Sequence, residues 1–123
     1  MNLDFSSEKP IFLQIAQELE DAIFTGAFPE ETQMPSTTDI SVSYKINPAT
    51  VLKGVNILVD EGIAYKKRGI GIFVSKGAVH KIRQKRQKDF SKDYIETLIM
   101  EAKKLGLSKK DIIELIGGSM EDE

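Results

Sequence analysis

Apolar positions in the first part of the chain recur at the spacing of an α-helix. Between Pro10 and Thr25 they return at steps of three and four residues, which is typical of one face of an amphipathic helix: Ile11, Phe12, Ile15, Ala16, Leu19, Ala22 and Ile23. Pro10 suits the first helical turn and Gly26 suits the end. The sequence therefore predicts a helix over residues 10–25 and an irregular connection over residues 26–35.

Capping residues predict two shorter helices after this connection. Ser36 and Asp39 have the spacing of a capping box, which favours a helix from there to about Tyr44. Asparagine is a preferred N-cap and proline a preferred first helical residue, so Asn47-Pro48 predicts a second start. The apolar side of this helix, which ends at Gly62, consists of Val51, Leu52, Val55, Leu58 and Val59. Three helices in this order are the arrangement of a helix-turn-helix.

Beyond the third helix the apolar positions alternate, which is typical of β-strands. The alternating residues are Ile63 and Tyr65 in one run, and Ile72 and Val74 in the next. The segment Arg68-Gly69-Ile70-Gly71 supplies the turn of a hairpin whose tip carries Lys66, Lys67 and Arg68. Residues 1–76 are therefore predicted to be a mostly α-helical domain with a small β-hairpin, which is a winged helix-turn-helix.

Residues 77–123 are predicted to form a separate helical region. A basic run, residues 81–88, contains one apolar residue and is interpreted as a solvated linker or helix face, with DNA contact as the alternative. A helical apolar face then follows: Phe90, Tyr94, Ile95, Leu98, Ile99, Ala102 and Leu105. Ser108 and Asp111 form a second capping box, which opens a final helix that we expect to stop at Gly117-Gly118. The apolar residues of that helix include Ile112, Leu115 and Ile116.

Charge is segregated along the 123 residues, although the formal net charge is only −2. Residues 1–40 hold one base and eight acids, residues 45–92 hold twelve bases and three acids, and residues 93–123 hold four bases and eight acids. A basic middle between acidic flanks indicates one surface suited to a polyanion. The chain shows no secretory signal and no apolar run of ~18 residues that could cross a membrane. We expect no membrane partner and a cytoplasmic, nucleoid-associated protein.

The residues needed for catalysis or metal binding are scarce. The chain has no cysteine and a single histidine, His80, so thiolate zinc sites and thiol nucleophiles are excluded. Gly69-x-Gly71 lacks the third glycine of a dinucleotide fingerprint, and there is no Walker A sequence. We expect no enzymatic activity, no catalytic residue, no metal and no cofactor.

Several separate motifs together resemble the GntR family of bacterial transcription regulators. They are Pro10-Ile-Phe-Leu-Gln-Ile, Met34-Pro35-Ser36, Ile46-Asn47-Pro48-Ala49-Thr50-Val51, and the segment from Glu61 to Val74. The Asn-Pro-Ala-Thr-Val helix start and the short two-helix tail are similar to its YtrA subfamily. The resemblance implies an N-terminal DNA-binding domain and a C-terminal part that dimerises and is too short for an effector domain. It also implies control of operons that often encode ABC-type transporters.

The helix that begins at Pro48 is expected to enter the major groove, as recognition helices do. Free N–H groups at the helix start near Ser36 suit a phosphate, and the hairpin tip suits the backbone or the minor groove. The expected DNA-binding residues are Ser36, Thr37, Thr38, Asn47, Pro48, Thr50, Lys53, Lys66, Lys67, Arg68, Gly69 and Gly71. The chain departs from the family pattern at Thr38, where many members have arginine, and at Leu52, where many have a basic or polar residue.

The apolar faces of the tail predict homodimerisation, because a monomer would leave them exposed. The expected contact residues are Phe90, Tyr94, Ile95, Leu98, Ile99, Ala102, Leu105, Ile112, Leu115 and Ile116. Two-fold protein symmetry predicts an inverted-repeat operator in double-stranded DNA. We expect a sequence-specific repressor, with room for an unidentified small-molecule effector at the dimer interface. The alternative is a winged-helix module that contacts protein or RNA without operator specificity, since charge alone does not separate these partners.

Overall fold

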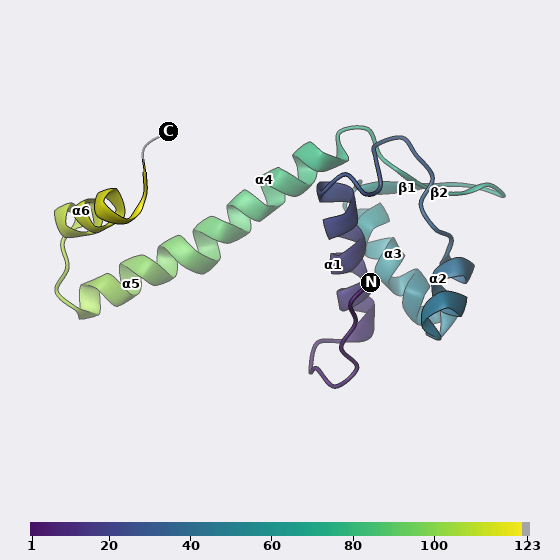
Figure 1. Ribbon diagram of the computed structural model, residues 1–123, viewed down its shortest axis with the longest axis horizontal. Helices are drawn as coiled ribbons and strands as arrows, with labels where there is room; N and C mark the ends of the chain where they lie inside the picture. Colours follow the sequence, from purple (N-terminus) through teal and green to yellow (C-terminus); the bar gives the residue numbers. More distant parts are fainter. Residues whose placement is uncertain (122–123) are drawn as a thin grey trace. The chain divides into compact units, whose positions relative to one another are not determined.

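Local capping chemistry sets the starts of the second and third helices in the computed structural model, which describes residues 1–121 (Figure 1). The helices are α1 (Ile11–Phe24), α2 (Thr37–Tyr44) and α3 (Pro48–Asp60). Ser36 and Asp39 form a reciprocal capping box at the start of α2. The side chain of Asn47 accepts a hydrogen bond from the Ala49 N–H at 2.8 Å, directly before Pro48. The predicted starts of α2 and α3 are therefore confirmed.

The turn between α2 and α3 is fixed by a buried hydroxyl. Lys45 adopts a left-handed conformation with φ of 54°, which ends α2. The buried Ser41 hydroxyl donates to the Ile46 carbonyl oxygen at 2.6 Å, and the Ile46 N–H donates back to the Ser41 carbonyl at 3.0 Å. Ile46 itself is buried in the core. This closed pair of hydrogen bonds holds α3 in a defined direction relative to α2.

The core lies between α1 and α3, which approach each other at backbone distance. A Cβ added to Gly54 of α3 would lie 2.7 Å from the Phe12 carbonyl oxygen and 3.0 Å from Cγ2 of Ile15. The fully buried side chains around this crossing are Ile15, Leu19, Ile23, Val51, Val55 and Leu58. Leu52, assigned from the sequence to the apolar side of this helix, is 40% exposed, so that assignment was wrong. The buried side of α3 follows Val51, Gly54, Val55 and Leu58 and leaves Leu52 facing outward.

The wing is a two-stranded antiparallel hairpin with an additional segment at its edge. The strands are β1 (Ala64–Lys67) and β2 (Gly71–Val74), with Ala64 opposite Val74. The predicted irregular connection runs along the free edge of β2, since the Met34 N–H donates to the Ile72 carbonyl at 2.8 Å and the Val74 N–H to the Thr32 carbonyl at 3.0 Å. The mostly helical winged helix-turn-helix expected from the sequence is thus confirmed.

The winged unit continues past the hairpin into the next helix. The chain divides into two compact units, residues 1–84 and residues 85–123, whereas the sequence analysis ended the first domain at residue 76. Helix α4 (Ala78–Phe90) begins within the first unit, and its Ala78 and Ile82 are buried in that core. The Glu30 carboxylate accepts the N–H groups of Gly77 and Val79 at 2.7 and 3.1 Å. Glu30 therefore caps the start of α4.

The second unit contains the end of α4 and three further helical segments. They are a π-helical turn η1 (Ser91–Ile95), α5 (Glu96–Lys104) and α6 (Lys109–Ser119). The predicted capping box of Ser108 and Asp111 is present. The expected stop of the last helix at Gly117-Gly118 was wrong, because α6 continues to Ser119 and the Met120 N–H donates to the Ile116 carbonyl at 2.9 Å. Glycine inside a helix costs about 1 kcal/mol, which weakens a helix without ending it. The last two residues of the predicted region 77–123 lie outside the described residues.

Candidate nucleic-acid interface

The segments expected to contact DNA lie at the surface of the first unit. Thr38, Asn47, Pro48 and Lys53 are exposed, as are Lys66 to Gly69 at the hairpin tip. The more enclosed members of the predicted set are Ser36, Thr37, Thr50 and Gly71, which are half-buried. The expected residues thus come from the starts of α2 and α3 and from the wing of one compact unit.

Two of the expected cations are held at or beside α3 by contacts that the sequence did not predict. The Lys53 ammonium lies 4.0 Å from the centre of the Phe12 ring of α1, which is a cation–π geometry. The Lys66 ammonium of β1 donates to Oδ1 of Asn56 on α3 at 2.6 Å. Asn56 therefore joins the wing to α3, and both positive charges are positioned by neighbouring side chains.

The wing tip is braced from one side by Gln33. Its amide nitrogen donates to the Ile70 carbonyl oxygen at 3.1 Å. Gly71, with φ of 150°, lies so close that an added Cβ would be 2.5 Å from this nitrogen. Gly69 in the turn has φ of 77°, a conformation that glycine adopts without steric cost. Both glycines of the predicted tip are thus required by the shape of the turn.

An aromatic pair on one face of the hairpin supports the charge of Lys67, the last residue of β1. The rings of Tyr65 and Phe73 are stacked with their centres 5.7 Å apart. The Lys67 ammonium lies 4.5 Å from the centre of the Phe73 ring. Arg68, the next residue, is exposed at the turn. Opposed aromatic residues on one face of a hairpin could have been found from the strand register, whereas Gln33 gives no local signal of its role.

At the start of α2, Ser36, which was expected to face a phosphate, is engaged in the capping box with Asp39. The Ser36 hydroxyl accepts the Asp39 N–H at 2.9 Å, and the Asp39 carboxylate accepts the Ser36 N–H at 3.1 Å. The N–H groups of Thr37 and Thr38 belong to the first turn, where no carbonyl of the helix can accept them. A phosphate oxygen approaching α2 would therefore meet these two N–H groups beside a carboxylate, which weakens the attraction.

Part of the basic run in residues 81–88 is used inside the first unit. The Lys81 ammonium donates to the Gly62 carbonyl oxygen at 3.2 Å, where the third helix has ended. The Arg83 guanidinium lies 5.6 Å from the centre of the Phe24 ring. These two side chains hold the start of α4 against the winged unit, in addition to the cap that Glu30 provides.

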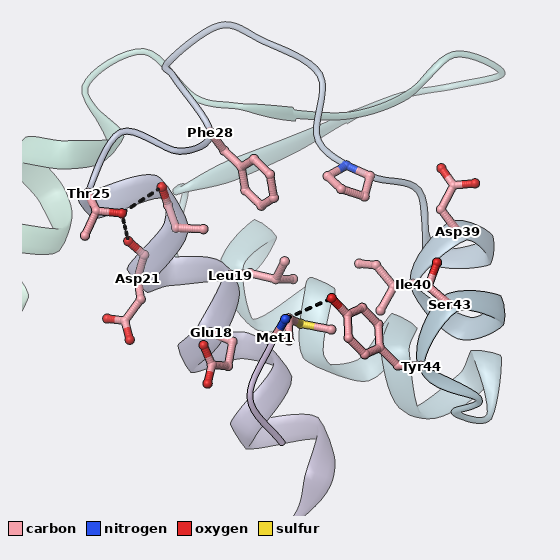
Figure 2. A pocket seen from close by; sticks show the side chains of 12 residues that line it. Met1, Glu18, Leu19, Asp21, Thr25, Phe28, Asp39, Ile40, Ser43 and Tyr44 are labelled. Atoms are coloured by element: carbon pink, nitrogen blue, oxygen red, sulfur yellow. Dashed lines mark hydrogen bonds between the residues drawn. The ribbon is translucent and has the colours of Figure 1, made fainter. Parts of the chain in front are cut away.

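Three acidic side chains line a cavity between α1 and α2, one of them at the start of α2 (Figure 2). The cavity has a volume of about 410 Å³, and its apolar walls include Leu19, Phe28 and Ile40. The carboxylates among its lining residues belong to Glu18, Asp21 and Asp39. Carboxylates repel phosphate groups, so this part of the surface is unsuited to nucleic acid.

Most of the residues expected to mediate dimerisation are exposed apolar side chains of the second unit. The exposed members of the predicted set are Phe90, Tyr94, Ile95, Leu98, Ile99, Leu105, Leu115 and Ile116, with exposed fractions between 37% and 74%. Ile112 is half-buried, and Ala102 is 6% exposed, so the Ala102 side chain packs inside its own chain. Met100 and Ile113, each 58% exposed, are further exposed apolar residues of this unit that the predicted dimerisation set does not include.

Within residues 1–121, no group of three or more histidine, cysteine, aspartate or glutamate side chains is arranged to hold a metal ion. In the same range, no helix combines the length and the apolar character needed to cross a membrane.

Comparison with known proteins finds similar sequences and folds among bacterial transcription regulators. The sequence profile of the family described as "Bacterial regulatory proteins, gntR family" matches residues 12–74. The chain is 28% identical to the uncharacterized HTH-type transcriptional regulator YhcF of Bacillus subtilis (strain 168), over 93% of either chain. It is 27% identical to the HTH-type transcriptional repressor YtrA of the same organism, over 94% of this chain and 88% of that one. Its fold is similar to a GntR-family regulator structure from Bacteroides thetaiotaomicron, with a TM-score of 0.73, 34% identity and coverage of 85% and 91%.

Proposed function

The chain belongs to the gntR family of bacterial regulatory proteins, and from this premise we propose that it is a repressor that binds an inverted-repeat operator as a homodimer. Family membership, including the expected likeness to the YtrA subfamily, is confirmed by matches that span most of the chain. The chain is accordingly a DNA-binding transcription regulator and not an enzyme. The operator, the dimer and the direction of control belong to the proposal.

The observation that supports the DNA-binding part is the set of positioned cations on α3 and the wing. Lys53 is held by Phe12, Lys66 by Asn56 and Lys67 by Phe73. Pre-positioned cations lose less side-chain entropy when they bind phosphates than free ones do. The start of α3 then lies in the major groove, where Asn47, Thr50 and Lys53 approach bases or flanking phosphates. Arg68 and the neighbouring glycines of the wing follow the backbone or the minor groove.

The apolar surface of the second unit supports the dimer. Its exposed residues Phe90, Tyr94 and Leu98 advance in steps of four residues, and such steps drift around an α-helix because 3.6 residues complete one turn. The π-helical turn η1 lies within this series and takes an extra residue into one turn, which reduces the drift. The exposed apolar side chains are thereby kept closer to one line, as an interface between two copies requires.

Repression follows from occupancy, because a dimer bound across a promoter excludes the polymerase. The likeness to the YtrA subfamily supports a transporter operon as the target and the cytoplasm as the location. A small-molecule effector would bind where two copies of residues 85–121 meet and would release the protein from DNA.

The test is the affinity of the full chain for DNA from its own upstream region, measured by fluorescence anisotropy against salt concentration. A scrambled duplex of the same composition and an RNA duplex serve as matched controls. We expect the upstream DNA to bind at least ~10³-fold tighter than the scrambled duplex, with an affinity that falls steeply as salt rises. Equal weak binding to all three duplexes would overturn the proposal and favour a module that contacts protein.

A further inference from the structure

The outward face of α3 carries an apolar side chain that none of the contacts proposed above uses. Leu52 is 40% exposed, while its neighbours Val51 and Val55 are completely buried. Ala49, one helical turn earlier on the same face, is also exposed. We propose that Leu52, supported by Ala49, contacts the C5-methyl group of thymine in the major groove and selects thymine at that position. This inference rests on the proposed function, since it requires α3 to lie in the groove.

The chemistry of the major groove leaves one kind of partner for such a side chain. Base edges there present hydrogen-bond donors and acceptors, and the methyl group of thymine is the apolar exception. A leucine has no donor or acceptor, so it cannot satisfy a guanine, adenine or cytosine edge that loses water. Leu52 against any other base would leave polar edges without partners, which disfavours those sequences.

The polar residues beside Leu52 on α3 are held in place by other elements. The Lys53 ammonium lies over the Phe12 ring. The Asn56 side-chain oxygen accepts a hydrogen bond from the Lys66 ammonium. The positions 49, 52, 53 and 56 fall on one helical face at steps of three and four. The Lys53 and Lys66 ammonium groups attract the phosphates that border the groove, while Ala49 and Leu52 form the apolar part of this face. The same face thus combines backbone attraction with an apolar base contact.

The experiment uses the duplex sequence that the full chain selects from a random double-stranded library. Each thymine is replaced in turn by uracil, which keeps the base pair and removes only the methyl group. Anisotropy at low salt gives the ratio of the two dissociation constants for the wild-type chain and for the Leu52→Ala, Leu52→Met and Leu13→Ala variants. Leu13 is a matched control because it is a helical leucine with 38% exposure on α1, which carries none of the expected DNA contacts.

At one thymine of each half-site, we expect replacement by uracil to weaken binding of the wild-type chain about four-fold. This is the factor that corresponds to burying one methyl-sized group. The loss should persist in Leu52→Met and Leu13→Ala and should vanish in Leu52→Ala. Thermal unfolding of Leu52→Ala should match the wild type, since the replaced side chain lies at the surface.

Three results would overturn the inference, and they differ from one another. A wild-type chain insensitive to uracil at every position would refute the methyl contact and leave the proposed function intact. A methyl effect of the same size in Leu52→Ala would assign that contact to another residue. Failure of the library to yield any preferred sequence would overturn the proposed function together with the inference.

Discussion

Replacing Gly54 by alanine tests the helix crossing that positions the recognition helix. The added Cβ would lie 2.7 Å from the Phe12 carbonyl oxygen and 3.0 Å from Cγ2 of Ile15. A main-chain oxygen in α1 and a completely buried isoleucine cannot move aside as the end of a flexible side chain could. The two helices must therefore separate by several tenths of an ångström, which also displaces Phe12 from beneath Lys53.

The size of the effect follows from two opposing contributions. Overpacking a well-filled core costs about 1–3 kcal/mol, whereas alanine in a helix is favoured over glycine by about 1 kcal/mol. The short distance to a backbone atom places the cost in the upper part of its range, so we expect a net loss of roughly 1–2 kcal/mol. For a unit of this size, that loss lowers the melting temperature by about 5–15 °C.

The assay is thermal unfolding of the full chain followed by far-ultraviolet circular dichroism, with Gly118→Ala as the matched control. Gly118 also lies within a helix, α6, but an added Cβ there meets nothing within 4 Å. The control should unfold at or above the wild-type temperature, because it gains helix propensity without a clash. A Gly54→Ala chain as stable as the wild type would refute the close contact between α1 and α3.

Three further substitutions test the cap of α4, the wing tip and the dimer interface. The hydrogen bonds that Gly77 and Val79 donate hold the pKa of Glu30 below its ordinary value of 4.5, so its contribution to stability is present above that value and is lost as pH falls through the lowered pKa. Glu30→Gln should therefore melt below the wild type at pH 7, and a gap that stays constant into acid would contradict this reasoning. Arg68→Ala should reduce the salt dependence of DNA binding by about one unit of slope with stability within about 0.5 kcal/mol of the wild type, and unchanged operator affinity would remove the wing tip from the interface. Leu98→Asp should convert a dimer to a monomer in light scattering, while an intact dimer would place Leu98 outside the interface.

The features that the sequence predicted well are those decided within a few residues. The capping boxes at Ser36 and Ser108 and the Asn47-Pro48 start each depend on side chains and N–H groups within one helical turn. The alternation of the hairpin is likewise local, and an antiparallel pair of strands forms where it was expected. Such local patterns are sufficient to predict the order of the helices and strands, because each element depends on its own residues and not on contacts with the others.

The features that the sequence missed depend on residues far apart along the chain. Glu30 caps α4 across more than forty positions, and Phe12 holds Lys53 only because α1 and α3 cross at Gly54. Leu52 fits the apolar pattern of its helix equally well facing inward or outward, and the direction was decided by which face α1 covers. The charged and apolar residues of a site can thus be found from the sequence, whereas the contacts that hold them require the fold.

We propose that two copies of this chain bind two inverted half-sites of DNA. The most direct test of this proposal is the mass and affinity of the complex formed with the selected duplex, compared with duplexes that carry a single half-site or the same half-sites as a direct repeat. We expect two chains on the inverted repeat and a marked loss of affinity for the other two duplexes. One chain per duplex, with equal affinity for all three, would contradict it.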